Sequence, residues 1–88
     1  MIEAADQYVS IQSASDKHLV RLSMDYLEKA LDPALFIRTH RSYIIGINAV
    51  RSVEQYEPKN LLIHLEGGFK AKLSQSRKIL FERKLKLG

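Results

Sequence analysis

The chain has 88 residues, the size of one domain with a modest hydrophobic core. It contains no cysteine, which excludes disulfides, thiolate metal sites and a cysteine nucleophile, and which fits a reducing, cytoplasmic environment. The formal net charge of +4 is unevenly distributed, because residues 69–88 carry seven basic residues and one acid. This asymmetry favours a polyanionic partner, although a solvated helix face with many lysines would give the same pattern. No apolar run approaches the roughly 18 residues of a membrane span, and no signal peptide is visible.

The N-terminal residues predict a β-hairpin. Residues 2–12 contain two short apolar pieces, of which residues 8–11 alternate and are rich in β-forming types. Residues 13–17 are polar and predict the loop, and residues 18–22 predict the returning strand. His18 has no second histidine at metal-binding spacing, so we expect it to face solvent.

A helix is predicted next, with Ser23 as its N-cap. The serine hydroxyl can accept a hydrogen bond from an early backbone N–H, and Asp25 favours the positive end of the helix dipole. One apolar face, expected to lie in the core, is formed by Met24, Leu27 and Leu31. Pro33 disfavours helical geometry in the residue before it, so the helix should end near Leu31.

Residues 36–47 change character halfway along. The first half gathers five side chains that can donate hydrogen bonds, namely Arg38, His40, Arg41, Ser42 and Tyr43. The second half, residues 43–47, is apolar and rich in β-branched types, which predicts a buried strand. A basic cluster would then be held on a rigid support. A solvated turn before a strand fits the composition about equally well.

Three further strands are predicted in the second half of the chain. They cover residues 50–56, 61–66 and 69–73, the first with a bulge because its apolar positions do not alternate. Pro58 marks the turn between the first two strands. The pair Gly67-Gly68 predicts a two-residue hairpin before the third.

A last helix should begin at Ser74 or Ser76, both of which are suitable N-caps. Its apolar side has an imperfect period and consists of Ile79, Leu80, Phe81 and Leu85. The predicted fold is therefore a mainly β domain of antiparallel sheets, with one internal helix and one C-terminal helix.

The central segment carries a resemblance to a known family. The run His40-Arg41-Ser42-Tyr43-Ile44-Ile45, with Phe36 and Arg38 upstream, resembles the central motif of the LytTR DNA-binding domain family. The usual pattern there is Phe-x-Arg-x-His-Arg-Ser-Tyr-Ile-Val-Asn. Weaker matches occur in the family's order at Glu3-Ala4, Tyr8-Val9, Arg21-Leu22-Ser23, Leu27-Glu28, Gly67-Gly68 and Leu73-Ser74. The resemblance covers roughly residues 2–85.

The resemblance implies an elongated β fold and sequence-specific binding to double-stranded DNA as the output domain of a bacterial transcriptional response regulator. It also implies that residues 1–88 form a single domain. We expect this domain to be truncated, lacking the family's first strand and an N-terminal receiver or other regulatory domain. In the full-length protein, dimerisation on paired half-sites is expected.

In this family, loops rather than a recognition helix contact the duplex. Residues 6–8, 40–42 and 72–78 match those loops. Base contacts are expected from Tyr8, Arg41, Ser74 and Gln75, of which arginine can pair with guanine and glutamine with adenine. The complete expected DNA-binding set is Gln7, Tyr8, His40, Arg41, Ser42, Lys70, Lys72, Ser74, Gln75 and Arg77. Within it, phosphates would be held by His40, Ser42, Lys70, Lys72 and Arg77.

Several of these residues have a purely structural alternative. Tyr8 could be a core or cross-strand aromatic, and His40 could cap the entry to the strand. Gln75 could face water from the first turn of the helix. Lys70 and Lys72 could protect an edge strand from aggregation.

The chain departs from the family pattern at two places. Gly46 stands where asparagine is common, and residues 74–76, Ser-Gln-Ser, stand where Ser-Arg is common. The loss of that arginine puts the recognised base sequence in doubt more than the binding itself. Arg41 also has a structural alternative, an ion pair with Glu54 or Glu66.

Sequence motifs for catalysis are missing, since the chain contains no phosphate-binding glycine loop, no His-Glu-x-x-His and no cysteine pair. We therefore expect no enzymatic activity, catalytic residue, cofactor, metal ion or small-molecule substrate. The rival interpretation is a small basic β module that binds protein or RNA through the same face.

Overall fold

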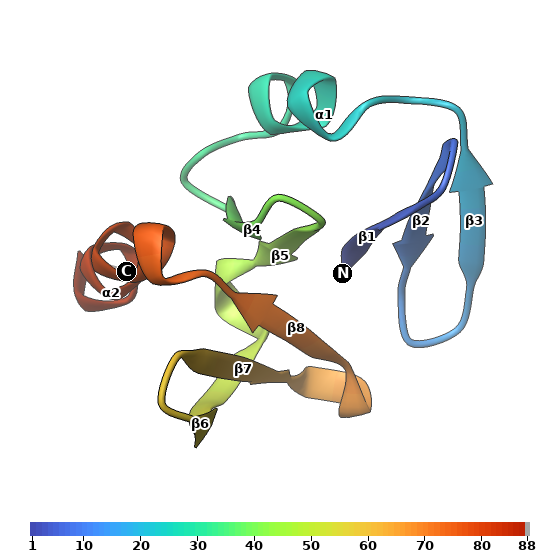
Figure 1. Ribbon diagram of the computed structural model, residues 1–88. Helices are drawn as coiled ribbons and strands as arrows, with labels where there is room; N and C mark the ends of the chain where they lie inside the picture. The colour runs from blue at the N-terminus through green and yellow to red at the C-terminus, as the bar shows by residue number, and fades with distance from the viewer. Residues whose placement is uncertain (88) are drawn as a thin grey trace.

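Two antiparallel sheets form the framework of the structure, a computed structural model that describes residues 1–87. The first sheet has five strands, in the spatial order β3 (Lys17–Val20), β2 (Tyr8–Gln12), β1 (Ile2–Ala5), β5 (Tyr43–Gly46) and β4 (Phe36–His40). The second has three, in the order β6 (Val50–Glu57), β7 (Asn60–Leu65) and β8 (Lys70–Leu73). With helices α1 (Met24–Ala30) and α2 (Lys78–Leu87), this architecture confirms the predicted fold class (Figure 1).

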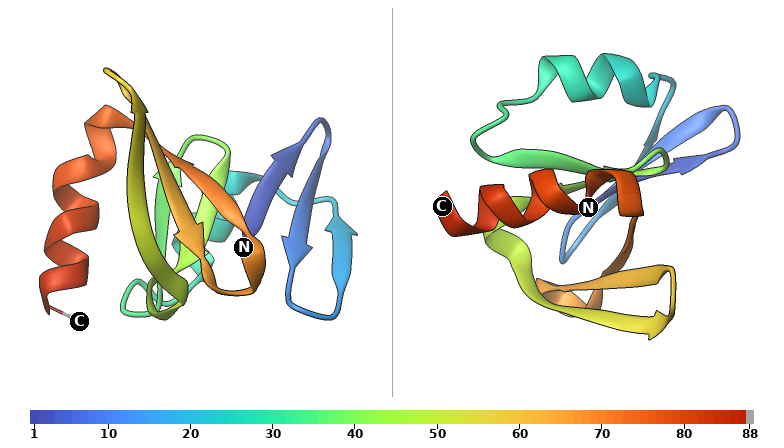
Figure 2. Two further views of the ribbon diagram at one scale, coloured as in Figure 1. Left: turned by 90° about the horizontal axis from the view of Figure 1, so that it is seen from below. Right: turned by 60° about the vertical axis from the view of Figure 1, so that its left-hand side comes forward.

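The strand β5 supplies both hydrophobic cores, because successive side chains of a strand point to opposite faces. Ile44 packs beneath α1 with Met24 and Leu27. Ile45 faces the second sheet and packs with residues that include Ile63. The first sheet is therefore covered by α1 on one face and by the three-stranded sheet on the other, as the right-hand view of Figure 2 shows. Tyr43–Gly46 is thus the buried strand that its composition predicts.

The strand β4 was missed by the sequence analysis, which weighed the hydrogen-bond donors of this segment above its alternation. Ile37 and Thr39 are buried, whereas Phe36, Arg38 and His40 are partly exposed. This period of two is typical of a half-buried strand. The basic cluster therefore lies along a strand, and only residues 41–42 form the turn into β5.

Several local predictions are confirmed. The Ser23 hydroxyl accepts a hydrogen bond from the backbone N–H of Tyr26 at 3.0 Å, and α1 ends with Leu31 as its C-cap. The strand β6 shows register shifts, as its irregular pattern predicts. Residues 2–5, which the pattern left unassigned, form β1 and pair with β2 across a turn at residues 6–7.

The loop between β7 and β8 is longer than predicted. The backbone N–H of Leu65 donates to the carbonyl of Phe69 at 2.8 Å, so three residues lie between them instead of two. Gly67 and Gly68 both have positive φ, 85° and 84°, and glycine adopts this conformation without the steric penalty that other residues incur.

The last helix begins in two stages. Ser74 precedes a 3₁₀ turn, Gln75–Arg77, but its hydroxyl makes no capping bond and lies 3.3 Å from the Ser76 hydroxyl instead. Phe81 anchors α2 in the core at 2% exposure, while the other apolar residues of its predicted stripe, Ile79, Leu80 and Leu85, are exposed. Neither α-helix in the part of the chain that the structure describes is long and apolar enough to cross a membrane.

Candidate nucleic-acid interface

Backbone hydrogen bonds bring distant loops together at one end of the domain. The N–H of Ala4 donates to the carbonyl of Ser42 at 2.9 Å, which sets the β1–β2 turn beside the β4–β5 turn. The N–H of Ser74 donates to the carbonyl of Thr39 at 2.8 Å, which joins the segment before α2 to the end of β4. We call this end the loop edge. It consists of residues 6–8, 21, 40–42, 56–60 and 72–77. The left-hand view of Figure 2 shows its turns along the top and α2 running away from it.

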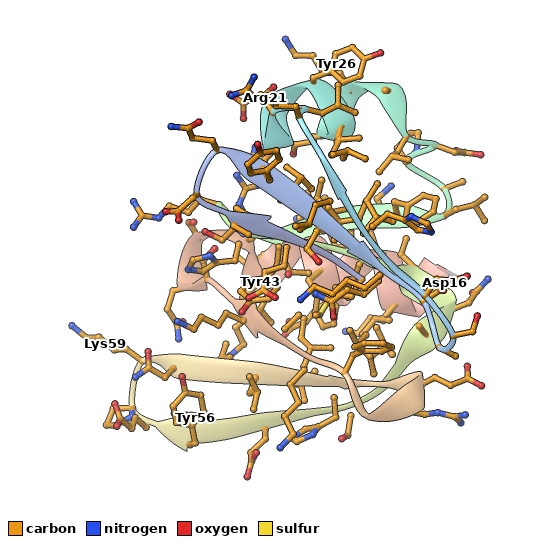
Figure 3. The ribbon with its side chains drawn as sticks, turned by 90° about the vertical axis from the view of Figure 1, so that its right-hand side faces the viewer. Asp16, Arg21, Tyr26, Tyr43, Tyr56 and Lys59 are labelled. Carbon is orange, nitrogen blue, oxygen red and sulfur yellow. The ribbon has the colours of Figure 1, made fainter. Side chains whose placement is uncertain are left out.

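A fourth segment, the β6–β7 turn, reaches the same edge. The side-chain amide of Gln75 donates to the carbonyl of Lys59 at 3.2 Å. Figure 3 shows Tyr56 and Lys59 at the tip of this hairpin, with Arg21 at the same side of the domain and Asp16 at the opposite end. Sequence analysis missed Tyr56 and Lys59 as members of the site, since only the tertiary contact with Gln75 reveals them.

The hairpin tip at the first loop presents an aromatic ring and a cation together. Tyr8 is 43% exposed, so the alternative that it packs in the core is wrong. The guanidinium of Arg21 lies 5.7 Å from the centre of the Tyr8 ring and donates to Gln7 Oε1 at 3.4 Å. Val9 pairs with Val20 across the hairpin, which puts the next residue, Arg21, beside Tyr8. The strand register was thus a signal in the sequence that could have identified Arg21.

His40 lies partly buried at the end of β4. Its Nδ1 accepts the backbone N–H of Ser42 at 3.1 Å, and its ring meets that of Tyr43 edge-on at 5.9 Å. Burial lowers the pKa of His40 below its ordinary value of 6.5, and the nearby charges of Lys72 and Arg41 lower it further. The neutral ring, protonated on Nε2, therefore stabilises the turn while its second nitrogen can donate outward. The alternative that His40 caps the entry to the strand therefore accounts for the bond at Nδ1 but not for the outward-facing Nε2.

Tyr43 fastens the start of β5 to β1. Its hydroxyl donates to Glu3 Oε2 at 2.9 Å. Burial, together with this carboxylate, raises the pKa of Tyr43 to about 12. The phenol therefore stays protonated at neutral pH, and the strand that follows the Arg41–Ser42 turn is held in place.

Arg41 projects from the turn without an intramolecular partner. Within residues 1–87, its guanidinium makes no hydrogen bond or ion pair. The two acids considered as alternatives are engaged elsewhere, Glu54 at 3.0 Å from His64 and Glu66 at 3.4 Å from Arg51. The ion-pair alternative for Arg41 is therefore wrong, and its five donors face solvent.

A shallow groove of about 300 Å³ gathers four of the predicted DNA-binding residues. It is lined by His40, Tyr56, Lys59, Asn60, Leu61, Lys72, Leu73, Ser74 and Gln75. Among the residues that the structure describes, its lining includes two lysines, Lys59 and Lys72, and no acidic residue, so this part of the surface is positively charged. The structure thus brings together residues from three separate loops at this point.

Six of the ten predicted residues do not line the groove, namely Gln7, Tyr8, Arg41, Ser42, Lys70 and Arg77. Arg77 is 31% exposed and lies 3.5 Å from Glu28, so its charge is partly compensated within the domain. Lys70 pairs with His64 at the far end of the β7–β8 ladder, two residues further from the loop edge than Lys72. In residues 1–87, no group of three or more histidine, aspartate or glutamate side chains is placed to hold a metal ion.

Comparison with known proteins gives a consistent result. The sequence profile of the LytTr DNA-binding domain matches residues 1–86. The transcriptional regulatory protein LytR of Staphylococcus aureus strain MW2 is 33% identical over 67 residues, which cover 76% of this chain and 27% of that protein. The CO-responsive transcriptional regulator RcoM of Rhodospirillum rubrum is 36% identical over 62 residues, covering 70% of this chain and 26% of RcoM.

A solved structure has the same fold. It is the LytTr DNA-binding domain of a Bacillus cereus protein described as a methyl-accepting/DNA response regulator. The TM-score is 0.84 at 25% identity, and the match covers 96% of this chain and 77% of that one. The chain spans about a quarter of the length of the curated relatives. The profile match over nearly every residue means that the chain belongs to the LytTr DNA-binding domain family.

Proposed function

We propose that this domain binds duplex DNA in a sequence-specific manner through its loop edge, as the output domain of a bacterial transcriptional response regulator. The observation that carries the proposal is the meeting of four loops at one edge, with Arg41 unpaired there and with Lys59 and Lys72 in one groove. A protein must both hold phosphates and contact base edges to recognise a duplex sequence. The loop edge offers side chains of both kinds.

The role proposed for each residue follows from whether its hydrogen-bond donors are already engaged within the described part of the domain. Arg41 has an unengaged guanidinium fork and is our candidate for a guanine contact. Lys72 and Lys59 present single ammonium groups, which suit phosphates. Further phosphate contacts are assigned to the Ser42 hydroxyl and to His40 Nε2. Lys70 and Arg77 do not line the groove, and they contact more distant phosphates or bind phosphate more weakly.

The side chains of Gln75, Gln7 and Ser74 already make hydrogen bonds within the domain. The Gln75 amide donates one of its two N–H groups to the Lys59 carbonyl, so bidentate pairing with adenine N6 and N7 must use the other N–H in the orientation that this bond fixes. Gln7 Oε1 similarly accepts from Arg21. We infer that these residues contribute less discrimination than Arg41, whereas the exposed ring of Tyr8 is free to contact a base.

The two relatives support a regulatory role, since both LytR and RcoM are described as transcriptional regulators. We propose that this domain acts in the cytoplasm within a longer protein, with an N-terminal receiver or other sensor domain. Dimerisation of that protein would place two loop edges on paired half-sites.

Selection from random duplexes, followed by affinity measurements at two salt concentrations, tests the proposal. We expect one preferred sequence, discrimination of about a thousandfold or more over random duplex, and a steep loss of affinity with salt. Arg51→Ala is a matched control because Arg51 is an exposed arginine, 66% exposed, near the β6 end away from the loop edge. Tighter binding to single strands or RNA than to any duplex would favour the rival interpretation and refute this one.

A further inference from the structure

The guanidinium of Arg38 is largely covered at the surface between α1 and the β4–β5 turn, although it carries a permanent charge. Its side chain, on β4, is only 9% exposed. Its Nη1 contacts two carboxylates of α1, at 2.5 Å from Asp25 Oδ1 and 3.0 Å from Glu28 Oε1. These acids compensate a charge that burial would otherwise penalise, and the hydrogen bond holds the pKa of the Asp25 carboxyl below its ordinary value.

The other side of this guanidinium binds the backbone of the turn. Arg38 Nη2 donates to the carbonyl oxygen of Arg41 at 2.6 Å. A charged donor makes a shorter and stronger hydrogen bond than a neutral one. The β4–β5 ladder shifts register between Arg38 and His40, so the peptide between Arg41 and Ser42 lies outside the regular ladder. Two side chains therefore hold this peptide outside the ladder, Arg38 at its carbonyl and His40 at its N–H.

Glu28 extends this contact to a second loop. One of its oxygens accepts from Arg38, and the other lies 3.5 Å from Arg77 Nη1. Arg77 ends the 3₁₀ turn that follows Ser74. Two segments of the loop edge are thus connected through buried or half-buried side chains anchored on α1.

We propose that Arg38 is a positioning residue for sequence discrimination, because it fixes the backbone of Arg41 and thereby the direction of the Arg41 guanidinium. This inference rests on the proposed function and assigns a role to a residue that does not itself contact DNA. Arginine pairs with guanine only when both donors lie in the plane of the base, whereas a phosphate accepts many approach directions. A loosened turn should consequently lose discrimination before it loses affinity for random DNA.

Arg38→Lys in the 88-residue chain tests this role. Lysine keeps the positive charge and can pair with one α1 acid, but a single ammonium cannot also reach the Arg41 carbonyl from the opposite side of the fork. We expect the affinity ratio between the preferred duplex and random duplex to fall by about tenfold or more, with affinity for random duplex and the salt slope unchanged. A residue with only a structural role would lower the melting temperature and leave the ratio of the folded protein as it was.

A DNA-independent measurement accompanies the binding assay. The backbone N–H of Ser42 donates to His40 Nδ1, so its hydrogen exchange reports on the turn. In Arg38→Lys, exchange at Ser42 should accelerate relative to the amides of β7 (Asn60–Leu65). Unchanged relative exchange at Ser42 would overturn the proposal.

A second pair of variants keeps the test decisive if Arg38→Lys fails to fold. Glu28→Gln weakens the links to both Arg38 and Arg77, whereas Asp25→Asn removes a carboxylate that is bonded to Arg38 alone. Each change removes a negative charge that holds Arg38, so both should lower discrimination; ratios equal to the parent's in both variants would overturn the proposal. A parent chain without any preferred duplex would refute the proposed function. A parent with a preference that Arg38→Lys retains would refute only the role of Arg38.

Discussion

The side-chain amide of Gln75 donates a hydrogen bond to the backbone carbonyl of Lys59 at 3.2 Å, which ties the start of the last helix to the tip of the β6–β7 hairpin. Lys72 lines the same groove, so two lysines from different hairpins border it. The loop edge is therefore a tertiary arrangement, and its charges are best tested one at a time.

Lys72→Ala should weaken binding to the preferred duplex and to random duplex by a similar factor. Its ammonium is exposed on β8, so its removal should also make the salt slope shallower by about one contact. Salt-dependent titrations of both duplexes measure this, with Arg51→Ala as the control. If random-duplex binding stayed intact and preference vanished, Lys72 would be a base contact instead.

Arg77→Ala should weaken random-duplex binding less than Lys72→Ala does. The ion pair with Glu28 at 3.5 Å already offsets part of the Arg77 charge. A fluorescence titration of both variants at one salt concentration compares them. An Arg77→Ala loss as large as that of Lys72→Ala would mean that Arg77 leaves Glu28 to bind phosphate.

Ile44→Ala should lower the free energy of unfolding by about 2–5 kcal/mol, because the side chain is 1% exposed beneath α1. A domain of this size has only about 5–15 kcal/mol in total, so much of the population should unfold on mild heating. Phe36→Ala should cost less, since Phe36 is partly exposed. Urea denaturation measures these values, with Leu19→Ala, 59% exposed, as the near-neutral control. An Ile44→Ala protein as stable as the parent would contradict a buried β5.

The stability of the domain should fall through His40 as the pH decreases below the ordinary histidine pKa of 6.5. The folded pKa lies below the ordinary value of 6.5, so the unfolded chain takes up a proton first as the pH decreases. The neutral His40 contributes fully to the free energy of unfolding above pH 6.5. This contribution is lost as the pH falls from 6.5 towards the pKa of His40 in the folded state, and stability does not change further through His40 below that pKa. Urea denaturation of the parent and of His40→Asn at several pH values isolates this effect. Parallel curves for the two proteins would show that His40 titrates alike in both states.

Alternation and turn residues were sufficient to predict most elements of the fold, because each depends on neighbours in sequence. Ser23, Pro33 and the period of two in residues 69–73 correctly indicated the first helix and the last strand. The strand β4 was missed because its polar side chains lie on a strand supported by the buried Thr39, whose hydroxyl donates to the Lys72 carbonyl at 2.9 Å. That contact joins residues 33 positions apart, and no local pattern contains it.

The candidate site was predictable to a similar extent. The donor-rich composition and the family resemblance identified the Arg41–Ser42 segment, and the structure leaves its arginine unpaired among the described residues. The sequence could not reveal that Glu28 would form an ion pair with Arg77, nor that the carbonyl of Lys59 would accept a hydrogen bond from Gln75. These contacts form because of the way in which the two sheets and a helix pack together. That packing depends on the whole chain and not on any local stretch of sequence.

The last prediction concerns Arg41 itself. Its guanidinium is always charged and carries a rigid fork of donors, so it can serve a phosphate or a guanine edge. As a base contact, Arg41→Ala should weaken binding to the preferred duplex by roughly 1–3 kcal/mol and relax specificity at one or two base pairs. Since its side chain makes no contact with Glu54 or Glu66, the melting temperature should equal that of the parent.

Arg41→Lys separates the two roles of this side chain. Lysine keeps the charge and loses the fork, so affinity for random duplex should recover better than discrimination does. Repeating the duplex selection with each variant and measuring its melting temperature gives both quantities on the same protein. Full recovery of discrimination by lysine would assign Arg41 to a phosphate. An Arg41→Ala protein with the parent's melting temperature and undiminished selectivity would remove Arg41 from the mechanism, and the meeting of loops at this edge would then need another residue to account for sequence preference.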